Sequence, residues 1–221
     1  MNESPIKNLN LINIELMEYE KALHFQHKLI ILRKNNKIFD TLILMEHPHV
    51  YTIGLVGKRK NVLISDDELY EMNIKLIHVK RGGDVTYHGP GQIIGYCIIK
   101  FNEFDKTIKQ FVHCLEEVFI RLLKVNFFID SFRERQYPGV WTKKGKIVAI
   151  GIRIKKGILY HGFAFNVNTN LKYFKYIIPC GISGKEVTSL ASITNAYQCI
   201  ENLKDLIVKS FSEIFMYNLC Y

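Results

Sequence analysis

The chain has 221 residues, of which 48% are hydrophobic and 23% are charged, and its formal net charge is +9. This composition is typical of a globular protein with a sizeable core, and we expect residues 1–221 to form a single domain. No apolar run reaches the roughly 18 residues of a membrane span, and the N-terminus lacks the apolar core of a signal peptide. We therefore predict a soluble, cytoplasmic protein with no membrane partner.

The N-terminal half of the chain shows the periodicities of both helices and strands. The spacing of apolar residues predicts a helix over Met17–Arg33, followed by a strand over Thr41–Glu46. A capping box at Ser65–Glu68 opens a short helix. Strand-like runs follow at Lys75–Lys80 and Gln92–Lys100. This order is neither strict βαβ alternation nor all-β.

The C-terminal half continues the irregular order. Apolar residues three and four positions apart predict a helix over Ile108–Leu122. Strand-like runs follow at Val125–Asp130, Lys146–Ile154 and His161–Asn166. A last helix is predicted over Leu203–Ile214. The whole pattern predicts an α/β fold in which helices surround a mixed sheet.

The positive charge does not by itself indicate a nucleic acid partner. The basic residues are scattered and form no stripe along a single helix, so we predict no nucleic acid binding. A basic surface that meets an acidic protein partner explains the charge as well. Lys155 and Lys156 are the first candidates for such a docking surface near the site entrance.

Neither the cysteines nor the histidines predict a metal site. The five cysteines are widely spaced and form no CxxC pair, so they indicate neither zinc binding nor a disulfide framework. Cys97 and Cys114 lie in an apolar strand and a helical pattern, and we expect both to be small core residues. His47 and His49 have an HxH spacing, but no carboxylate or cysteine cluster accompanies them. We interpret their segment as a turn and predict no metal.

A glycine-rich segment, Arg81–Gln92, contains four glycines within ten residues. Such a segment lets the backbone approach a ligand closely and expose its N–H groups. It does not fit the dinucleotide fingerprint, because the third glycine comes one residue too late and a strand follows it. A hairpin with a structural histidine, His88, is the alternative interpretation. The position of Arg81 beside two glycines favours a binding loop.

Two later segments carry small residues at positions where another group must pack closely. Lys146 begins a strand in which Ala149 and Gly151 are small, so either a ligand chain or a helix lies against it. Gly162 and Ala164 alternate in the next strand, where they either floor a groove or pack in the core of the sheet. Taken alone, Lys146 is better explained as a solvated surface lysine.

Cys180 is the most informative residue in the chain. It lies between Pro179 and Gly181, in a turn where a side chain is presented rather than buried. A cysteine in such a loop acts as a nucleophile only if a neighbour stabilises its thiolate. Lys146 is the candidate neighbour, and Arg81–Gln92 is the candidate substrate-binding segment.

Taken together, these segments resemble the lipoyl(octanoyl) transferases of lipoate biosynthesis, in the order and spacing of that family. The segments that carry the resemblance are Glu46–Gly54, Arg81–Gln92, Lys146–Arg153, His161–Asn168 and Pro179–Gly181. They span most of the chain, the run from Arg81 to Gln92 is the most specific, and the sequence beyond Ser192 is nonspecific. The resemblance implies a single-domain α/β fold of the biotin/lipoate protein ligase type.

The resemblance also implies an activity, which is the transfer of an octanoyl group from octanoyl-acyl carrier protein to a lysine of a lipoyl domain. The reaction would proceed through a cysteine acyl-thioester and need no cofactor, neither ATP nor a metal. The acceptors would be lipoyl domains of 2-oxoacid dehydrogenases and the glycine cleavage H protein, and we expect a monomer. Cys180 would be the nucleophile and Lys146 its partner. The implied substrate-binding residues are Arg81, Gly82, Gly83, Asp84, Val85, Thr86, Tyr87, His88, Ala149, Ile150, Gly151, Gly162, Phe163 and Ala164.

Two alternative functions stay open at this point. One is an ATP-dependent lipoate-protein ligase, although the related lipoate and biotin ligases use different glycine-rich loops. The other is a non-catalytic acyl- or nucleic-acid-binding module on the same fold. Mass spectrometry after incubation with octanoyl carrier protein, with and without ATP, separates the three.

Overall fold

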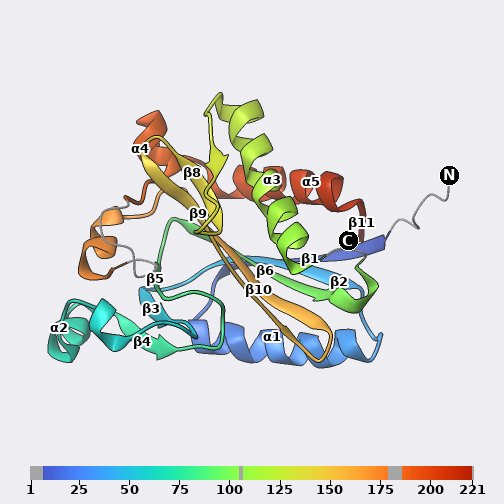
Figure 1. Cartoon of the computed structure of the whole chain (residues 1–221), viewed down its shortest axis with the longest axis horizontal. Coiled ribbons are helices and arrows are strands. Elements are labelled where there is room, and N and C mark those ends of the chain that lie inside the picture. The colour runs from blue at the N-terminus through green and yellow to red at the C-terminus, as the bar shows by residue number, and fades with distance from the viewer. Residues whose placement is uncertain (1–6, 105–106, 179–185, 221) are drawn as a thin grey trace.

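A computed structural model of the protein describes residues 7–104, 107–178 and 186–220. Its centre is a mixed sheet, whose eight described strands lie in the order β11-β1-β2-β6-β10-β9-β8-β7 (Figure 1). These strands are β1 (Lys7–Leu16), β2 (Asp40–Glu46), β6 (Gln92–Lys100), β7 (Phe132–Arg133), β8 (Gly139–Thr142), β9 (Gly145–Lys155), β10 (Ile158–Asn166) and β11 (Tyr217–Cys220). A smaller sheet has the order β4-β3-β5 and consists of β3 (Val50–Ile53), β4 (Lys75–His78) and β5 (Val85–His88).

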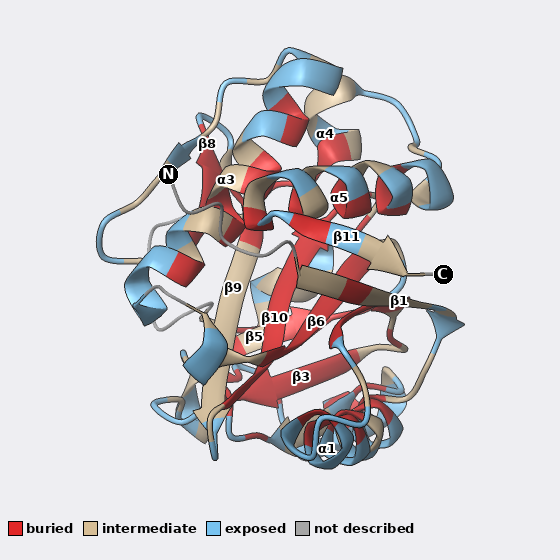
Figure 2. Ribbon diagram, turned by 90° about the vertical axis from the view of Figure 1, so that its right-hand side faces the viewer, coloured by how far each residue is buried: buried red, intermediate tan, exposed pale blue. Residues whose placement is uncertain are grey.

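Helices cover both faces of the large sheet, as the sequence predicts. The long helices α3 (Ile108–Phe127) and α5 (Ile200–Phe215) lie over one face, and α1 (Tyr19–Lys34) lies over the other (Figures 1 and 2). Two shorter helices are α2 (Asp66–Glu71) and α4 (Leu190–Thr194). Because both faces are covered, β6 and β10 are buried along almost their whole length, which accounts for their nearly unbroken apolar sequences. None of the helices in the described part of the chain is both long and apolar enough to span a bilayer.

The strand predicted over Val125–Asp130 is wrong, because α3 continues to Phe127. Leu122 and Leu123 are buried in the core of the sheet, so the helix keeps an apolar anchor through its last turns. The N–H groups of Phe128 and Ile129 then donate to the carbonyls of Lys124 and Leu123, and this closes the helix in a Schellman arrangement. The capping box predicted at Ser65 is confirmed and opens α2.

Candidate active site

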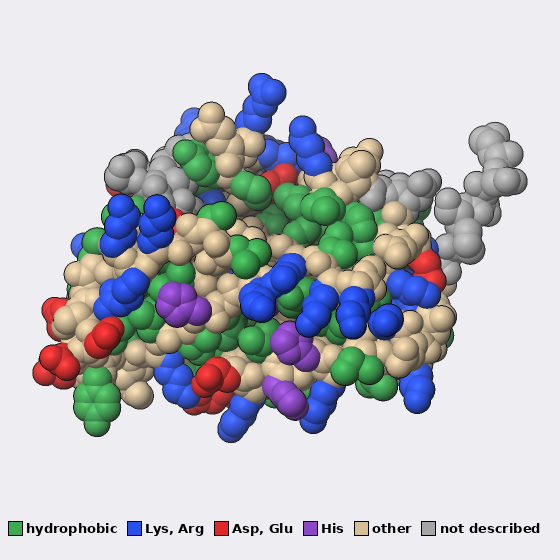
Figure 3. All heavy atoms as spheres, turned by 60° about the horizontal axis from the view of Figure 1, so that its bottom comes forward, with side chains coloured by type: hydrophobic (Ala, Val, Ile, Leu, Met, Phe, Trp, Pro, Cys, Tyr) green, Lys and Arg blue, Asp and Glu red, His purple; other side chains and the backbone are tan. Residues whose placement is uncertain are grey.

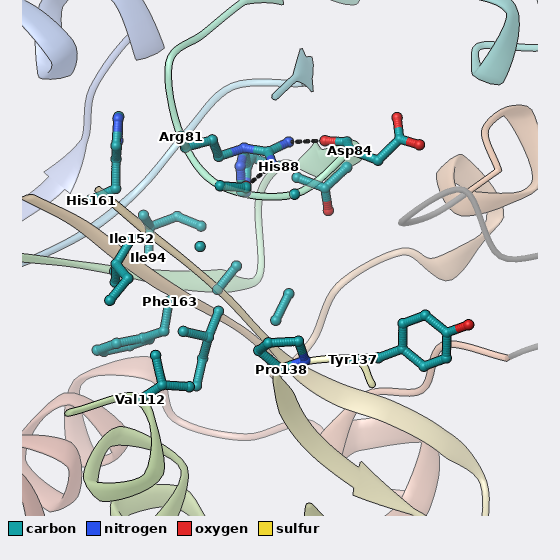
Figure 4. Close-up of a pocket in the computed structure, with 18 of the residues that line it drawn as sticks. Arg81, Asp84, His88, Ile94, Val112, Tyr137, Pro138, Ile152, His161 and Phe163 are labelled. Atoms are coloured by element: carbon teal, nitrogen blue, oxygen red, sulfur yellow. Dashed lines mark hydrogen bonds between the residues drawn. The ribbon is translucent and has the colours of Figure 1, made fainter. Parts of the chain in front are cut away.

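A cavity of about 380 Å³ lies between the glycine-rich segment and the β9–β10 hairpin (Figure 4). Lys146 and all but one of the substrate-binding residues implied by the resemblance line it. Those residues are Arg81, Gly82, Gly83, Asp84, Val85, Thr86, His88, Ala149, Ile150, Gly151, Gly162, Phe163 and Ala164. Segments that are far apart in the sequence therefore meet in one place.

Tyr87 is the exception, because its side chain packs into the small sheet. Its hydroxyl bonds Nδ1 of His49 at 2.7 Å, and its ring stacks on Tyr173 with centroids 4.9 Å apart. Alternation along β5 explains the difference, since successive side chains of a strand point to opposite faces. Thr86 and His88 face the cavity, whereas Tyr87 faces the cluster around Tyr51.

The floor of the cavity is open because small residues pair directly across two strands. The register of β9 and β10 places Ala149 opposite Ala164 and Gly151 opposite Gly162. A Cβ atom added at Gly162 would lie 2.2 Å from the carbonyl oxygen of Gly95 in β6. A Cβ atom added at Gly151 would lie 3.1 Å from the carbonyl oxygen of Gly82. Close packing against the backbone thus explains both glycines, and the same residues leave room for a ligand chain.

Arg81 is buried and holds the glycine-rich segment in shape. Its Nη2 donates to the carbonyls of Thr52 and Asp84 at 2.8 and 2.7 Å, and its Nη1 donates to the carbonyl of Gly82 at 2.9 Å. A second clamp comes from Asp84, whose carboxylate accepts from the side chain of Asn61 at 2.7 Å. The loop is therefore rigid, and its backbone is presented to the cavity in one conformation.

His88 is held neutral at the cavity wall. Burial is the largest cause that lowers its pKa well below the usual range, and the nearby His47 and Arg81 contribute. Its Nδ1 lies 2.8 Å from Oε1 of Gln92, whose amide nitrogen donates to Asn166. Oε1 of Gln92 must therefore accept, so Nδ1 of His88 carries the proton and Nε2 carries the lone pair.

The same network reaches the segment that follows Cys180. Asn166 donates to the carbonyl of Thr188 at 3.1 Å, and the N–H of Thr188 donates to the carbonyl of Lys146 at 2.9 Å. Before Pro179, on the N-terminal side of Cys180, the N–H of Ile178 donates to the carbonyl of Asn61 at 2.7 Å. One described flank is thus bonded to Lys146 at the cavity, and the other to Asn61, whose side chain bonds the cavity residue Asp84.

The predicted nucleophile, Cys180, lies outside the described residues, as do Pro179 and Gly181. Its role stays a prediction. Of the other cysteines, Cys97 is buried in the core as predicted, whereas Cys114 is only partly buried against it.

Lys146 is buried at the cavity, not solvated. Its ammonium group lies 3.2 Å from the carbonyl oxygen of Pro138 and 4.7 Å from the centre of the Trp141 ring. A carbonyl oxygen and the face of an indole both attract a cation. Both neighbours are therefore groups that can bind a lysine ammonium at this position.

Tyr19 and Tyr96 also line the cavity, but neither lies in a sequence motif that would have predicted this. Nδ1 of His47 bonds the carbonyl of Met17 and so carries the proton, which leaves Nε2 to accept from the hydroxyl of Tyr96 at 2.7 Å. The ring of Tyr19 lies beside this pair and stacks on His88, with centroids 5.8 Å apart. Burial raises the pKa of Tyr19 to about 12, so its hydroxyl stays protonated.

The structure shows where the HxH histidines and the two lysines proposed for docking lie. His47 and His49 point to different partners, and the described residues contain no group of three His, Cys, Asp or Glu side chains able to hold a metal. Lys155 and Lys156 lie at the opposite end of β9 from Lys146. The cavity extends along β9 as far as Ile152, three residues before Lys155, so the expectation that these lysines lie near the site entrance stays a prediction.

Comparison with known proteins adds independent evidence. The sequence model of a family described as "Lipoyl protein ligase A/B catalytic domain" matches residues 18–212. The octanoyltransferase of Caldicellulosiruptor saccharolyticus is 51% identical over 208 residues, which cover 94% of this chain and 88% of that protein. The octanoyltransferase of Desulforamulus reducens is 44% identical over 199 residues, which cover 90% of this chain and 87% of that protein.

Solved structures show the same fold at low sequence identity. A bi-partite lipoate protein ligase from Thermoplasma acidophilum has a TM-score of 0.73 at 15% identity, over 98% of this chain and 88% of that one. The biotin protein ligase of Aquifex aeolicus, in complex with biotin and ATP, has a TM-score of 0.56 at 17% identity, over 95% of this chain and 70% of that one. The predicted similarity to the biotin/lipoate protein ligase fold is confirmed.

Proposed function

Because the chain belongs to the lipoyl protein ligase A/B catalytic domain family and, within it, to the octanoyltransferases, we propose a chemical route for the octanoyl transfer that it performs in lipoate biosynthesis. Cys180 is the nucleophile, the acyl group passes through a thioester on its sulfur, and octanoyl-acyl carrier protein is the donor. The observation that carries this proposal is the cavity in which Lys146 and the glycine-rich segment meet.

In the first half-reaction, the thiolate of Cys180 attacks the carbonyl carbon of the donor thioester. The oxyanion that forms collapses, the bond to the carrier's sulfur breaks, and the carrier leaves as a thiol. Lys146 supplies the proton for this thiol and becomes neutral. A lysine ammonium beside a cysteine favours the thiolate needed for attack, and the contacts of Lys146 with Pro138 and Trp141 hold its ammonium group at the cavity.

In the second half-reaction, the neutral amine of the acceptor lysine attacks the octanoyl-Cys180 thioester. The new amide bond forms, the carbon–sulfur bond breaks, and Cys180 leaves as a thiolate. The proton lost by the attacking nitrogen returns to Lys146, which restores the ammonium–thiolate pair. Every proton is thus accounted for without a cofactor or a metal.

The cavity suits the octanoyl chain because small residues form its floor and apolar residues contribute to its walls. Ala149 and Ala164 form part of the floor, and Ile94 and Phe163 contribute apolar surface. Each buried methylene contributes about 0.8 kcal/mol, so a chain of this length is bound mainly by its burial. His88 is neutral beside it and therefore adds no buried charge.

The chain acts in protein lipoylation, as its family shows. We propose that its acceptors are lipoyl domains of 2-oxoacid dehydrogenases and the glycine cleavage H protein, and that it works as a monomeric single-domain enzyme in the cytoplasm. A lipoyl domain is the partner of the Thermoplasma acidophilum ligase that shares this fold, which supports the choice of acceptor class.

The test is intact mass spectrometry after incubation with octanoyl-acyl carrier protein in the absence of ATP. We expect a single octanoyl adduct on the wild-type protein, located at Cys180, and no adduct on Cys180→Ser, because a serine hydroxyl is far less acidic than a thiol. Cys199→Ser is the matched control, since Cys199 is exposed in the described structure. Normal turnover by Cys180→Ser would exclude the covalent route.

The same experiment decides between the alternatives. An adduct that appears only when octanoic acid and ATP are supplied would indicate a ligase, and the absence of any adduct or transfer would indicate a binding module. The fold cannot decide, because ATP-dependent ligases share it at 16% identity. The amino acid identity to octanoyltransferases is what favours transfer.

A further inference from the structure

Strand β9 has a free outer edge where it passes the cavity. β10 pairs with the inner edge of β9 from Val148 to Lys155. On the outer edge, β8 pairs with β9 only as far as Ala149, which lies opposite Gly139. Among the described residues, no strand therefore lies against the outer edge from Ile150 onward. A free strand edge presents a row of backbone N–H and C=O groups, and such a row can pair with another extended group.

The backbone groups of Ile150 point out of this free edge. A Cβ atom added at Gly82 would lie 3.2 Å from the carbonyl oxygen of Ile152 and 4.0 Å from its nitrogen, and one added at Gly139 would lie 2.3 Å from the carbonyl oxygen of Val148. Because β10 occupies the inner edge, both glycines approach β9 from outside. Backbone groups alternate between the two edges of a strand, so those of Ile150, midway between Val148 and Ile152, point outward as well. Neither its N–H nor its C=O is bonded to another residue in the described part of the chain.

The cavity passes around this edge. Val112 of α3 lines it on one face of the large sheet, and Tyr19 of α1 lines it on the opposite face. Paired strands leave no passage through a sheet, so a single cavity reaches both faces only where the pairing stops. Gly82 and Pro138, at the two ends of the free stretch, also line the cavity. The outward groups of Ile150 therefore face its open space.

The free stretch begins beside the ammonium group of Lys146. Because Gly139 pairs with Ala149, the preceding residue, Pro138, comes next along the edge, at the level of Ile150. The carbonyl of Pro138 is not bonded to the N–H of Ile150 and lies 3.2 Å from Nζ of Lys146 instead. In Figure 4 Pro138 lies well apart from Arg81 and the glycine-rich segment. A group that leaves the reaction centre along the outer edge of β9 thus meets Ile150 first.

We propose that the free edge of β9 at Ile150 binds the amide-containing arm of the donor thioester. Acyl carrier proteins hold the acyl group on a phosphopantetheine arm, whose β-alanine unit has an N–H and a C=O only a few bonds from the sulfur. These two groups pair with the C=O and N–H of Ile150, as a neighbouring strand would. This inference rests on the proposed function, because it gives a site to the leaving group of the first half-reaction. The octanoyl chain lies on the face of the hairpin, and the arm lies along its edge.

A donor and an acceptor side by side fit the arm better than the other groups that enter the cavity. An oxyanion would be attracted by the N–H of Ile150 but repelled by its C=O, and an alkyl chain would leave both groups unpaired. A strand of the acceptor protein is too bulky, because the stretch between Pro138 and Gly82 spans only about 7 Å, two residues of strand, and lies inside the cavity. The arm is a single thin chain, and its β-alanine unit has no side chain.

The kinetic test compares two small donors in transfer to a lipoyl domain without ATP. One is octanoyl-pantetheine, and the other is the octanoyl thioester of pentanethiol, which has no amide. We expect wild-type protein to favour octanoyl-pantetheine at least roughly tenfold in kcat/KM. Ile150→Pro removes the outward N–H but no bond to β10, and proline is tolerated at a free strand edge, so this preference should fall close to one.

The matched control is Ile154→Pro. By the same alternation its backbone groups point outward, and its side chain also packs partly against the core, but it does not line the cavity. Ile154→Pro should therefore keep the wild-type preference. The arm subsite is excluded if wild-type protein transfers equally well from both donors, or if a folded Ile150→Pro keeps the wild-type preference.

A second measurement needs no variant and decides the matter if Ile150→Pro does not fold. S-octyl pantetheine is a thioether and cannot transfer its chain, so it binds the wild-type protein without reaction. At saturation, hydrogen exchange measured by NMR should slow at least roughly tenfold at the amide of Ile150 and stay unchanged at that of Ile154. Unchanged exchange at Ile150 would overturn the proposal. Transfer from neither donor would instead be a failure of the proposed function, and the exchange measurement still decides whether the edge binds the arm.

Discussion

Lys146 shows how much the setting of one residue matters. A lysine at the start of a strand is usually solvated, yet here it is 6% exposed and its ammonium group contacts a carbonyl oxygen and an indole ring. In the proposed route this group stabilises a thiolate and also gives up and regains a proton. The two roles place different demands on the side chain, and they can be separated by substitution.

Lys146→Arg should slow the second half-reaction more than the first. Arginine keeps the positive charge, so the carrier's sulfur can still leave as a thiolate beside it, but arginine does not release its own proton and so cannot accept the one that the attacking amine loses. We expect octanoyl-enzyme to accumulate in Lys146→Arg, whereas Lys146→Ala should slow both half-reactions, by roughly 100-fold or more. Stopped reactions analysed by intact mass measure both steps. Equal rates for the two variants in both steps would show that the lysine acts only by position.

At the scale of elements, the β9–β10 hairpin uses two glycines for different purposes. Gly162 faces β6 in the centre of the sheet, where a Cβ atom would lie 2.2 Å from a backbone oxygen. Gly151 faces the glycine-rich segment, where a Cβ atom would lie 3.1 Å from the oxygen of Gly82. The first separation is shorter than any real Cβ contact, whereas the second requires the neighbouring backbone to move by only a few tenths of an ångström.

The alanine variants of these glycines should therefore differ. Gly162→Ala should destabilise the protein by about 1–3 kcal/mol, because the sheet must distort to relieve the overlap. Gly151→Ala should keep most of the stability but weaken binding of octanoic acid, because the methyl group intrudes on the cavity floor. Urea unfolding and acid binding by calorimetry measure the two effects. A stable Gly162→Ala protein would contradict the close packing between β6 and β10.

At the scale of the whole molecule, the net charge of +9 is spread over the surface. Figure 3 shows lysine and arginine side chains across one face, with acidic side chains gathered mostly toward the end where α2 lies. Val56 lines the cavity, and the exposed Lys58 and Lys60 follow it within four residues of the chain, so we take residues 56–60 as its charged rim. This rim is rigid, because Asn61 bonds both Asp84 and the backbone of Ile178.

An acidic carrier protein should therefore dock by charge at this rim. Higher salt should raise the apparent KM for the carrier protein while leaving transfer from a small octanoyl thioester nearly unchanged, because screening acts over about 8 Å at physiological ionic strength. Lys58→Glu with Lys60→Glu should mimic high salt, and the parallel variant Lys155→Glu with Lys156→Glu, at the other end of β9 from Lys146, shows which of the two pairs lies nearer the docking surface. A flat carrier KM together with tight, salt-sensitive duplex binding would favour the nucleic acid alternative instead.

Much of the fold follows from patterns that are local in the chain. The apolar runs of β6 and β10 and the periodic stripes of α3 and α5 are readable in the sequence, because each reflects burial on one or both faces. The short or polar strands cannot be predicted from the sequence, because their pairing with neighbouring strands is what makes them strands. β1 is largely unburied along its length and β11 has only four residues, yet each pairs with the other at the edge of the sheet.

The sequence by itself determined the family, the glycine-rich segment, and the candidates Lys146 and Cys180, because motif residues and their spacing are properties of the chain. Only the tertiary structure decided that Lys146 is buried against Trp141, that Tyr87 turns away from the cavity, and that Lys155 lies at the other end of β9 from Lys146. It also revealed that the buried imidazole of His161 has no hydrogen-bond partner among the described residues. Burial, the direction of a side chain and the distance between segments arise from packing between distant parts of the chain, and no local pattern encodes them.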